Sequence, residues 1–324
     1  MKVVCGYDPG EPYRPWFGGW ADEGALVVVS PEEDVAQFAS DLRDAEVLLH
    51  ILKPVTEEVL AGAPRLRLVQ KIGVGVDTID LEAAQRGGVA VANMPGTNTQ
   101  AVAEAALMLM LAALRNLPGL DRECRVGNGW TPKQEAQERR NTLGELCGRT
   151  VGLVGAGAVA SRLVGPLEGL GARVIYADRR ERPNLGIERH DLDDLLEASD
   201  VVSLHLPLTP ETEGLIDQKA LARMKPAAVL INTARGGLVE ETALVEALTS
   251  GRLLAAGLDV LAEEPPPPEE PAAEEVEREV PALAEESTSQ GFFDREEGGG
   301  TSSEEGARDS RIFRASRFLR RRSE

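Results

Sequence analysis

The sequence predicts an α/β protein of two domains, each a doubly wound parallel sheet with helices on both faces. Four observations predict it. Short apolar runs alternate with helical patterns along residues 1–92, and residues 151–178 follow a strand, glycine turn, helix and strand pattern. Aromatic residues make up only 4% of a chain that is 42% hydrophobic, so aliphatic side chains must fill the core. A length of 324 residues allows roughly two domains.

Residues 1–92 consist of repeated βα units. The apolar runs lie at 3–4, 25–29, 47–49, 66–72 and 89–92, with helix-like segments such as 31–44 between several of them. Ligands of parallel sheets bind at the carboxyl ends of the strands, and His50 and the segment 73–77 follow two of these runs. The glycines of 73–77 either expose consecutive N–H groups that could hold a carboxylate or form a plain turn, and the spacing leaves both open.

A turn-rich crossing at residues 93–98 leads into a long apolar helix. Residues 105–114 are ten consecutive apolar residues, so we expect this helix to be buried at a domain or subunit interface. Ten residues are too few to cross a bilayer, which needs roughly 20. Residues 116–140 are polar, and 127–130 mark a loop.

Residues 151–178 carry the pattern GAGAVA, which matches the GxGxxA glycine signature of dinucleotide sites. Gly155 permits the tight turn, Gly157 lets a pyrophosphate approach the helix N-terminus, and the small Ala160 lets the helix lie close on the sheet. Asp178 ends the second strand, where a carboxylate accepts hydrogen bonds from a ribose diol and repels a 2′-phosphate. The glycine pattern alone would also fit a structural turn, but its strand and helix context favours an NAD site.

The remaining strands are expected at 201–206, 229–232 and 255–260, with helices at 192–197 and 240–249. Polar residues lie at or just after the end of each strand: His205, then Thr233 and Arg235, then Asp259 with Glu264. Cofactor and substrate would both bind at this edge of the sheet.

Charge and cysteine content limit the partners. A net charge of −19 argues against nucleic acid, whose phosphates need a basic face. The three cysteines are widely spaced and form no CxxC, which supports neither disulfides nor a zinc site. Met1-Lys2 leads straight into a strand-like run without a signal-peptide pattern. We therefore expect a soluble cytoplasmic protein without membrane or metal partners.

The composition changes at Pro265. Residues 269–309 hold 14 acidic and 3 basic side chains, and residues 311–322 hold six arginines and no acidic residue. Low hydrophobicity with blocks of like charge is typical of disorder. We expect 265–324 to be a low-complexity, disordered tail without secondary structure.

The motifs of residues 45–265 resemble those of the D-isomer-specific 2-hydroxyacid dehydrogenases. The resemblance rests on KIGVGVDTIDLEAA, NMPGTNTQAVAE, GRTVGLVGAGAVA, VVSLHLPLTPET, LINTARGGLVEETALVEAL and AGLDVLAEEP, in the family's order. It implies a flavodoxin-like substrate domain at residues 1–98, a Rossmann domain that binds NAD at 99–264, a homodimer, and hydride transfer between nicotinamide and a small 2-hydroxy or 2-oxo acid.

The resemblance also implies site residues. The family's catalytic arginine falls on Arg235 and its glutamate on Glu264, although either residue alone would fit a surface ion pair. Val74, Gly75 and Asn98 match substrate contacts, and His50 is a further candidate near the substrate. The cofactor positions are Gly155, Ala156, Gly157, Ala158, Val159, Asp178, His205, Pro207, Thr212, Thr233, Ala234 and Asp259.

One departure affects catalysis. The family's proton-carrying histidine lies in a Pro-His pair after the glutamate, but the only histidines here are His50, His190 and His205. Three hypotheses follow: a working NAD-dependent dehydrogenase with an unusual end, a protein that binds NAD(H) without turnover, as in dehydrogenase-like corepressors, or a frameshifted end on an enzyme gene. The abrupt change of composition after EEP favours a frameshifted end as the origin of this sequence. The sequence does not show which 2-hydroxy acid is the substrate.

Overall fold

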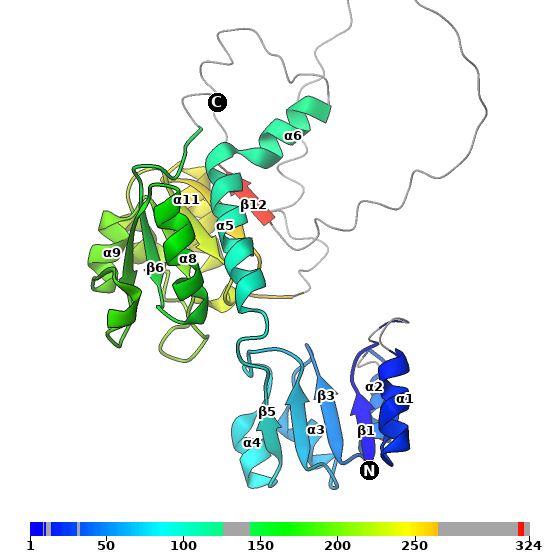
Figure 1. Cartoon of the computed structure of the whole chain (residues 1–324). Coiled ribbons are helices and arrows are strands. Elements are labelled where there is room, and N and C mark those ends of the chain that lie inside the picture. Colours follow the sequence, from blue (N-terminus) through cyan, green and yellow to red (C-terminus); the bar gives the residue numbers. More distant parts are fainter. Residues whose placement is uncertain (9, 11–13, 31–32, 126–142, 265–316, 321–324) are drawn as a thin grey trace, which may run out of the picture.

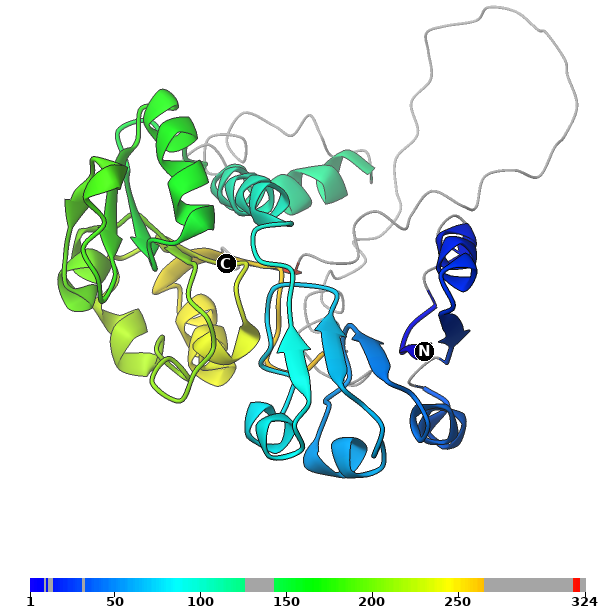
Figure 2. The same ribbon diagram turned by 60° about the horizontal axis from the view of Figure 1, so that its bottom comes forward.

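The computed structural model describes residues 1–8, 10, 14–30, 33–125, 143–264 and 317–320. Two lobes each contain one sheet, and residues 93–98 connect them (Figure 1). The predicted α/β architecture of two parallel-sheet domains is confirmed. In Figures 1 and 2 the strands of the first sheet end on the side that faces the second lobe, which is where the candidate residues were expected.

The first sheet has five parallel strands in the order β2-β1-β3-β4-β5. They span Lys2–Cys5 (β1), Leu26–Val29 (β2), Val47–His50 (β3), Leu68–Lys71 (β4) and Ala90–Ala92 (β5). The helices between them are Arg14–Asp22 (α1), Val35–Leu42 (α2), Glu57–Ala61 (α3) and Leu81–Arg86 (α4).

Helices cover both faces of this sheet. Side chains of α2, α3 and α4 pack with Val4, Leu48 and Val69 in one cluster. Phe17 of α1 packs with the next strand residues, which point the other way, in a second cluster. This alternation follows from the two-residue period of a strand.

The second sheet has the order β12-β11-β10-β9-β6-β7-β8, and every strand except β12 runs parallel to its neighbours. Its strands are Thr150–Val154 (β6), Arg173–Ala177 (β7), Glu188–Arg189 (β8), Val201–Leu204 (β9), Ala228–Asn232 (β10), Leu253–Leu258 (β11) and Arg317–Arg320 (β12). Its helices are Thr99–Arg115 (α5), Leu117–Arg125 (α6), Ala158–Gly169 (α8), Leu192–Ala198 (α9), Gln218–Arg223 (α10) and Glu241–Thr249 (α11), with short 3-10 turns at Pro183–Leu185 and Gly236–Leu238.

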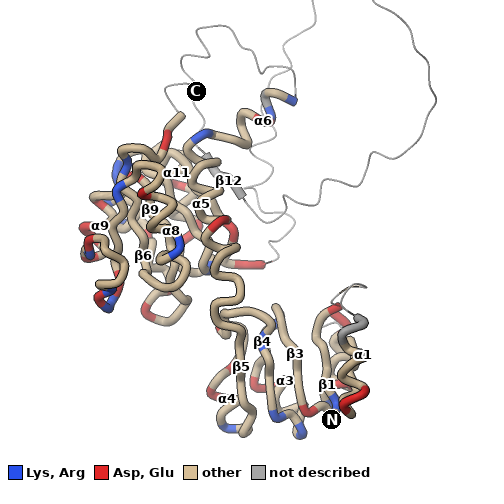
Figure 3. The backbone as a smooth tube through the Cα atoms, in the orientation of Figure 1, with Lys and Arg blue, Asp and Glu red and all other residues tan. Residues whose placement is uncertain are grey.

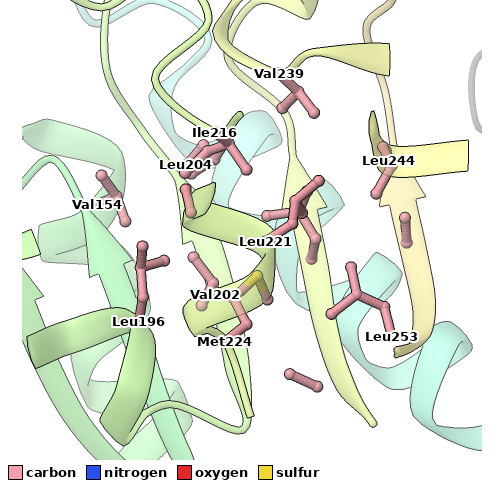
Figure 4. Close-up of a cluster of buried hydrophobic side chains, with 14 of the residues drawn as sticks. Val154, Leu196, Val202, Leu204, Ile216, Leu221, Met224, Val239, Leu244 and Leu253 are labelled. Atoms are coloured by element: carbon pink, nitrogen blue, oxygen red, sulfur yellow. The ribbon is translucent and has the colours of Figure 1, made fainter. Parts of the chain in front are cut away.

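Two hydrophobic clusters fill the second lobe. One packs α9, α10 and α11 against residues such as Val154, Val202 and Leu204 (Figure 4). The other packs α5 and α8 against Val151 and Leu153 on the opposite face. Every residue of this core is aliphatic or small except Met and Tyr side chains, as the low aromatic content predicted.

Short polar caps fix where several helices begin. The carboxylates of Asp34, Asp80 and Asp217 accept hydrogen bonds from backbone N–H groups in the first turns of α2, α4 and α10. Such caps satisfy donors that the helix itself leaves free. Acidic and basic residues both occur along the chain in the two lobes (Figure 3). Some of them pair, as where the guanidinium of Arg223 lies 3.1 Å from the carboxylate of Asp193.

Within this chain, only one side of the apolar helix α5 is buried. Leu109, Met110 and Leu114 are buried against β10 and β11, but Met108 is 47% exposed and Leu111 is 39% exposed. A helix that covers one face of a sheet buries only one side within its own lobe, so burial of the other side at a subunit interface stays a prediction. The helix α6 was also not predicted, and the loop expected at 127–130 lies outside the described residues.

Part of the C-terminal segment also departs from expectation. Arg317–Arg320 forms β12, which pairs antiparallel with the outer edge of β11, although we expected no secondary structure after residue 264. An edge strand offers unpaired N–H and C=O groups to any extended segment that reaches it. The rest of 265–324 lies outside the described residues.

Candidate active site

The glycine turn after β6 is shaped by a close neighbour. Gly155 has φ +91°, and a Cβ there would lie 2.6 Å from the backbone oxygen of His205. Only glycine combines this backbone conformation with so close an approach. The turn after β6 is tight, as its sequence predicted, and it packs on the end of β9.

Space is left open where the helix α8 begins. A Cβ on Gly157 would meet no atom within 4 Å, and no side chain of the described residues caps the helix at this position. Its free N–H groups and dipole favour an anion. A hollow of about 340 Å³ adjoins this end and is lined by Gly157, Ala158, Ser161 and the segment 181–185.

Asp178 lies at the end of β7, beside this turn. Its carboxylate accepts hydrogen bonds from the backbone N–H of Ala156 at 2.9 Å and of Arg180 at 2.8 Å, and Nε of Arg182 lies 3.6 Å away. Burial by itself would raise the pKa of Asp178, but these amide donors and Arg182 together lower it below its ordinary value. The group is held ionised next to the hollow.

Two polar atoms at the ends of β9 and β10 have no partner among the described residues. They are Nε2 of His205 and Oγ1 of Thr233, and both are shielded from solvent. Burial lowers the pKa of His205 to about 4, so its ring is neutral at physiological pH. Buried polar groups without partners are costly, and a nucleotide bound along this edge would supply partners. With the open helix end, these atoms fit a dinucleotide.

The neighbouring loop is fixed by its own hydrogen bonds. Oγ1 of Thr212 donates to the carbonyl of Pro207 at 2.7 Å and accepts from the N–H of Thr209 at 2.8 Å. Both Thr212 and Pro207 were expected near the cofactor, and they lie in one loop directly after β9.

Arg235 follows β10 on a turn that a buried asparagine organises. The side chain of Asn232 accepts from the N–H of Ala234 at 3.0 Å and donates to the carbonyl of Arg235 at 2.8 Å. A Cβ on Gly236 would overlap the backbone of Leu261, so this turn packs directly on the segment that leads to Glu264. Sequence reasoning missed the role of Asn232, because an asparagine at a strand end is common in any turn.

The guanidinium of Arg235 reaches the other lobe. Its Nε donates to both carboxylate oxygens of Asp77, at 3.0 and 3.1 Å, and its Nη1 donates to the carbonyl of Ala234 at 2.6 Å. A Cβ on Gly75 would overlap Nη2 of Arg235. The structure thus brings Arg235 together with Gly75 and with Asp77, which sequence reasoning had not singled out.

The segment after β11 contains two acidic candidates, Asp259 and Glu264. Burial raises the pKa of Asp259, and the carboxylate of Glu264 adds to the rise. Oε1 of Glu264 accepts a hydrogen bond from the N–H of Leu261 at 2.8 Å. Within the described residues Glu264 therefore contacts its own turn and makes no hydrogen bond to Arg235.

The remaining candidates lie at the substrate-domain edge. Val74 is partly exposed, its carbonyl accepts from Nδ2 of Asn93 at 2.7 Å, and Asn98 is the residue before α5. His50, in contrast, is fully buried, and its Nε2 lies 3.0 Å from Oγ1 of Thr78. The segment after β4 covers the end of β3 here, and contact between His50 and the substrate stays a prediction.

Comparison with known proteins identifies the family. The sequence model described as "D-isomer specific 2-hydroxyacid dehydrogenase, NAD binding domain" matches residues 107–279. The chain belongs to the D-isomer-specific 2-hydroxyacid dehydrogenase family. The glycine turn, Asp178 and the ends of β9 and β10 all lie within the part that matches this NAD-binding domain.

Three relatives illustrate the family. The chain is 41% identical over 254 residues to D-3-phosphoglycerate dehydrogenase of Mycobacterium bovis. The matched residues make up 77% of this chain but only 44% of that relative. It is 41% identical over 230 residues to glyoxylate reductase of Aeropyrum pernix, covering 69% of each chain. The NAD complex of NAD-dependent formate dehydrogenase from Staphylococcus aureus superposes with a TM-score of 0.76 at 29% identity, covering 84% of this chain and 85% of that one.

None of the described helices combines the length and apolarity required to cross a membrane. Likewise, no three His, Cys, Asp or Glu side chains in the described ranges gather in a way that could hold a metal ion.

Proposed function

We propose that this chain transfers a hydride between NAD(H) and a small 2-hydroxy or 2-oxo acid. The observation that carries the proposal is the position of Arg235, which follows β10 of the NAD-binding lobe and lies against Gly75 of the other lobe. A substrate held there would lie between the two sheets. We accordingly assign residues 1–98 to the substrate domain and 99–264 to the nucleotide domain.

Each candidate residue has a role in this proposal. Bound NADH would supply the hydride. Arg235 would bind the carboxylate of the acid and polarise its 2-oxo group, since a guanidinium fork matches both. The N–H groups of Val74 and Gly75, with Asn98, would hold the other end of the substrate. Asp178 would bind the ribose diol and favour NAD over NADP.

Proton transfer to or from the substrate hydroxyl is the step of the proposed reaction for which a residue is missing. Glu264 is suited to orient a neighbouring histidine, but residues 265–324 contain none, and the ring of His50 is buried. We therefore propose that turnover by this chain is impaired. The same observation favours a second candidate function, an NAD(H)-binding protein without turnover.

One experiment separates these functions. NADH binding is followed by fluorescence, and NADH oxidation is followed with glyoxylate and with hydroxypyruvate, for the unmodified chain and for Arg235→Lys. Slow oxidation that Arg235→Lys abolishes supports the dehydrogenase, whereas NADH binding with no oxidation by either protein supports the second function. Failure to bind NADH would contradict both.

A homodimer in the cytoplasm completes the proposal. The exposed side chains of Met108 and Leu111 extend the apolar surface of α5, and such a surface favours contact with a second copy. Cys5, Cys124 and Cys147 form no disulfide bond among the described residues, which suits a reducing compartment.

A further inference from the structure

The carboxylate of Asp77 and the guanidinium of Arg235 join the two lobes. Asp77 lies in the segment after β4 of the substrate domain, and Arg235 follows β10 of the nucleotide domain. The Asp77 side chain is 31% exposed and that of Arg235 is 36% exposed. Ion pairs with this much exposure add little to the stability of a fold, so stability does not account for the arrangement.

The geometry of the pair leaves the outer part of the guanidinium available. Asp77 takes only the Nε–H of Arg235, and the carbonyl of Ala234 takes one N–H of Nη1. A guanidinium has five N–H groups, so three of them, on Nη1 and Nη2, make no hydrogen bond to the described residues. These are the groups that an α-oxo carboxylate would need.

Contacts of the next residue, Thr78, hold the segment that carries Asp77 in place. The hydroxyl of Thr78 lies 3.0 Å from Nε2 of His50 and accepts from Nζ of Lys71 at 3.3 Å. The carbonyl of Thr78 accepts from the N–H of Val55 at 2.8 Å. These contacts with the ends of β3 and β4 fix the segment, so Asp77 presents its carboxylate to Arg235 from a firm support.

Gly75 provides the space for this arrangement. A Cβ at this position would overlap Nη2 of Arg235 and would lie 2.5 Å from Oδ1 of Asp77. The glycine therefore serves the pair, in addition to any hydrogen bonds that its own N–H makes. An arginine held through Nε and packed on a glycine has lost much of its rotational freedom before substrate arrives.

We propose that Asp77 is a positioning residue that orients Arg235 for the carboxylate and 2-oxo group of the substrate. The inference rests on the proposed function. Without Asp77 the guanidinium can rotate. Substrate binding must then order it, and the conformational entropy lost in that step weakens the binding. The alternative is that Asp77 competes with the substrate for Arg235, and it predicts the opposite sign.

Binding of oxamate to the NADH complex tests the proposal without turnover, since oxamate has a carboxylate and an α-carbonyl but accepts no hydride. We expect Asp77→Ala to weaken oxamate binding at least tenfold and Asp77→Asn to weaken it less, because the amide oxygen still accepts from Nε. NADH affinity should stay within twofold in both variants, which shows that the nucleotide domain is intact.

Asp80→Ala is the matched control. It removes a carboxylate three residues away that caps α4 through the N–H of Ala83 at 2.8 Å. We expect it to lower the melting temperature and to leave oxamate affinity unchanged. An Asp77→Ala chain that binds oxamate as tightly as the unmodified chain, or more tightly, overturns the positioning role.

A second measurement is independent of substrate. The Arg235 Nε–H resonance, assigned by its loss in Arg235→Lys, should be protected from exchange in the unmodified chain and unprotected in Asp77→Ala. If neither the unmodified chain nor any variant binds oxamate, the proposed function fails and the positioning role fails with it, even where the difference in Nε–H protection is observed. If oxamate binds normally and Arg235 Nε–H is equally exposed in both, only the positioning role fails.

Discussion

Gly155 and His205 approach each other across the ends of β6 and β9, and a Cβ on Gly155 would lie 2.6 Å from the carbonyl oxygen of His205. A Cβ on Gly157, two residues further on, would meet no atom within 4 Å. The two glycines of one motif thus serve different ends. The first is required by the protein itself, and the second leaves room beside the helix for a ligand.

The glycine pair provides a prediction with an internal control. Gly155→Ala should destabilise the chain by at least about 2 kcal/mol, because it combines strain at positive φ with a backbone clash. Gly157→Ala should unfold at the same urea concentration as the unmodified chain but bind NADH at least tenfold more weakly. Equal stability of the two variants would contradict this assignment.

Asp178 leads to a prediction about cofactor choice. The chain should bind NADH more tightly than NADPH, because an ionised carboxylate repels the 2′-phosphate. Asp178→Ala should narrow the difference, as measured by fluorescence titration with both nucleotides. Asp191→Ala is a suitable control, since the Asp191 side chain makes no capping hydrogen bond to α9. Tighter binding of NADPH to the unmodified chain would overturn the assignment, and Arg179 and Arg180 are the residues that could cause it.

Local patterns in the sequence were enough to predict most of the fold, including the strand, glycine turn and helix on which the nucleotide candidates lie. The strand, turn and helix around Gly155 obey steric rules that operate within a few residues, and Asp178 follows from the same unit. Apolar runs likewise located every strand of the two sheets except β8 and β12, because buried parallel strands are almost continuously hydrophobic.

The rest depends on contacts between distant residues. The burial of His50 depends on Thr78, which lies 28 residues later, and the partner of Arg235 lies 158 residues earlier. A strand-end histidine looks the same in sequence whether another segment covers it or not. The exposure of Met108 similarly depends on which layers surround α5, which the run of apolar residues does not specify.

His205 predicts a pH dependence of stability. Its pKa is about 4 in the folded chain, while an unfolded histidine has a pKa of about 6.5. As the pH falls, the unfolded chain binds this proton first, so the contribution is present above about pH 6.5 and is lost progressively down to about pH 4. The loss amounts to at most about 3 kcal/mol.

Urea unfolding between pH 7.5 and 4.5 measures this loss. His205→Asn should flatten the profile over that range, while His190→Asn, which changes a surface histidine 3.5 Å from Glu188, should keep it. A His205→Asn profile as steep as that of the unmodified chain would assign the pH dependence to other groups.

The exposed side of α5 predicts the oligomeric state. We expect a dimer at micromolar concentration by light scattering, and Met108→Glu with Leu111→Glu should give monomers, because charged groups are costly in an apolar interface. Val245→Glu places the same charge on α11 at a residue that is 45% exposed and should leave the dimer intact. A stable monomer of the unmodified chain would count against the proposal.

The last prediction concerns the rate of turnover. General acid–base catalysis typically contributes about 10² to 10⁴ in rate, and residues 265–324 contain no histidine to supply it. This chain should therefore reduce glyoxylate or hydroxypyruvate at least about a hundredfold more slowly than a version whose end, read in another frame of the gene, contains the family's Pro-His pair. NADH should bind equally well to both. Because His50 is buried against Thr78, His50→Ala should remove no proton carrier, and any loss of the residual rate should come only from loosening the segment that supports Asp77. If the 324-residue chain is fully active and His50→Ala abolishes that activity, His50 is the proton carrier; full activity that persists without His50 would mean that a group outside the candidate set carries the proton.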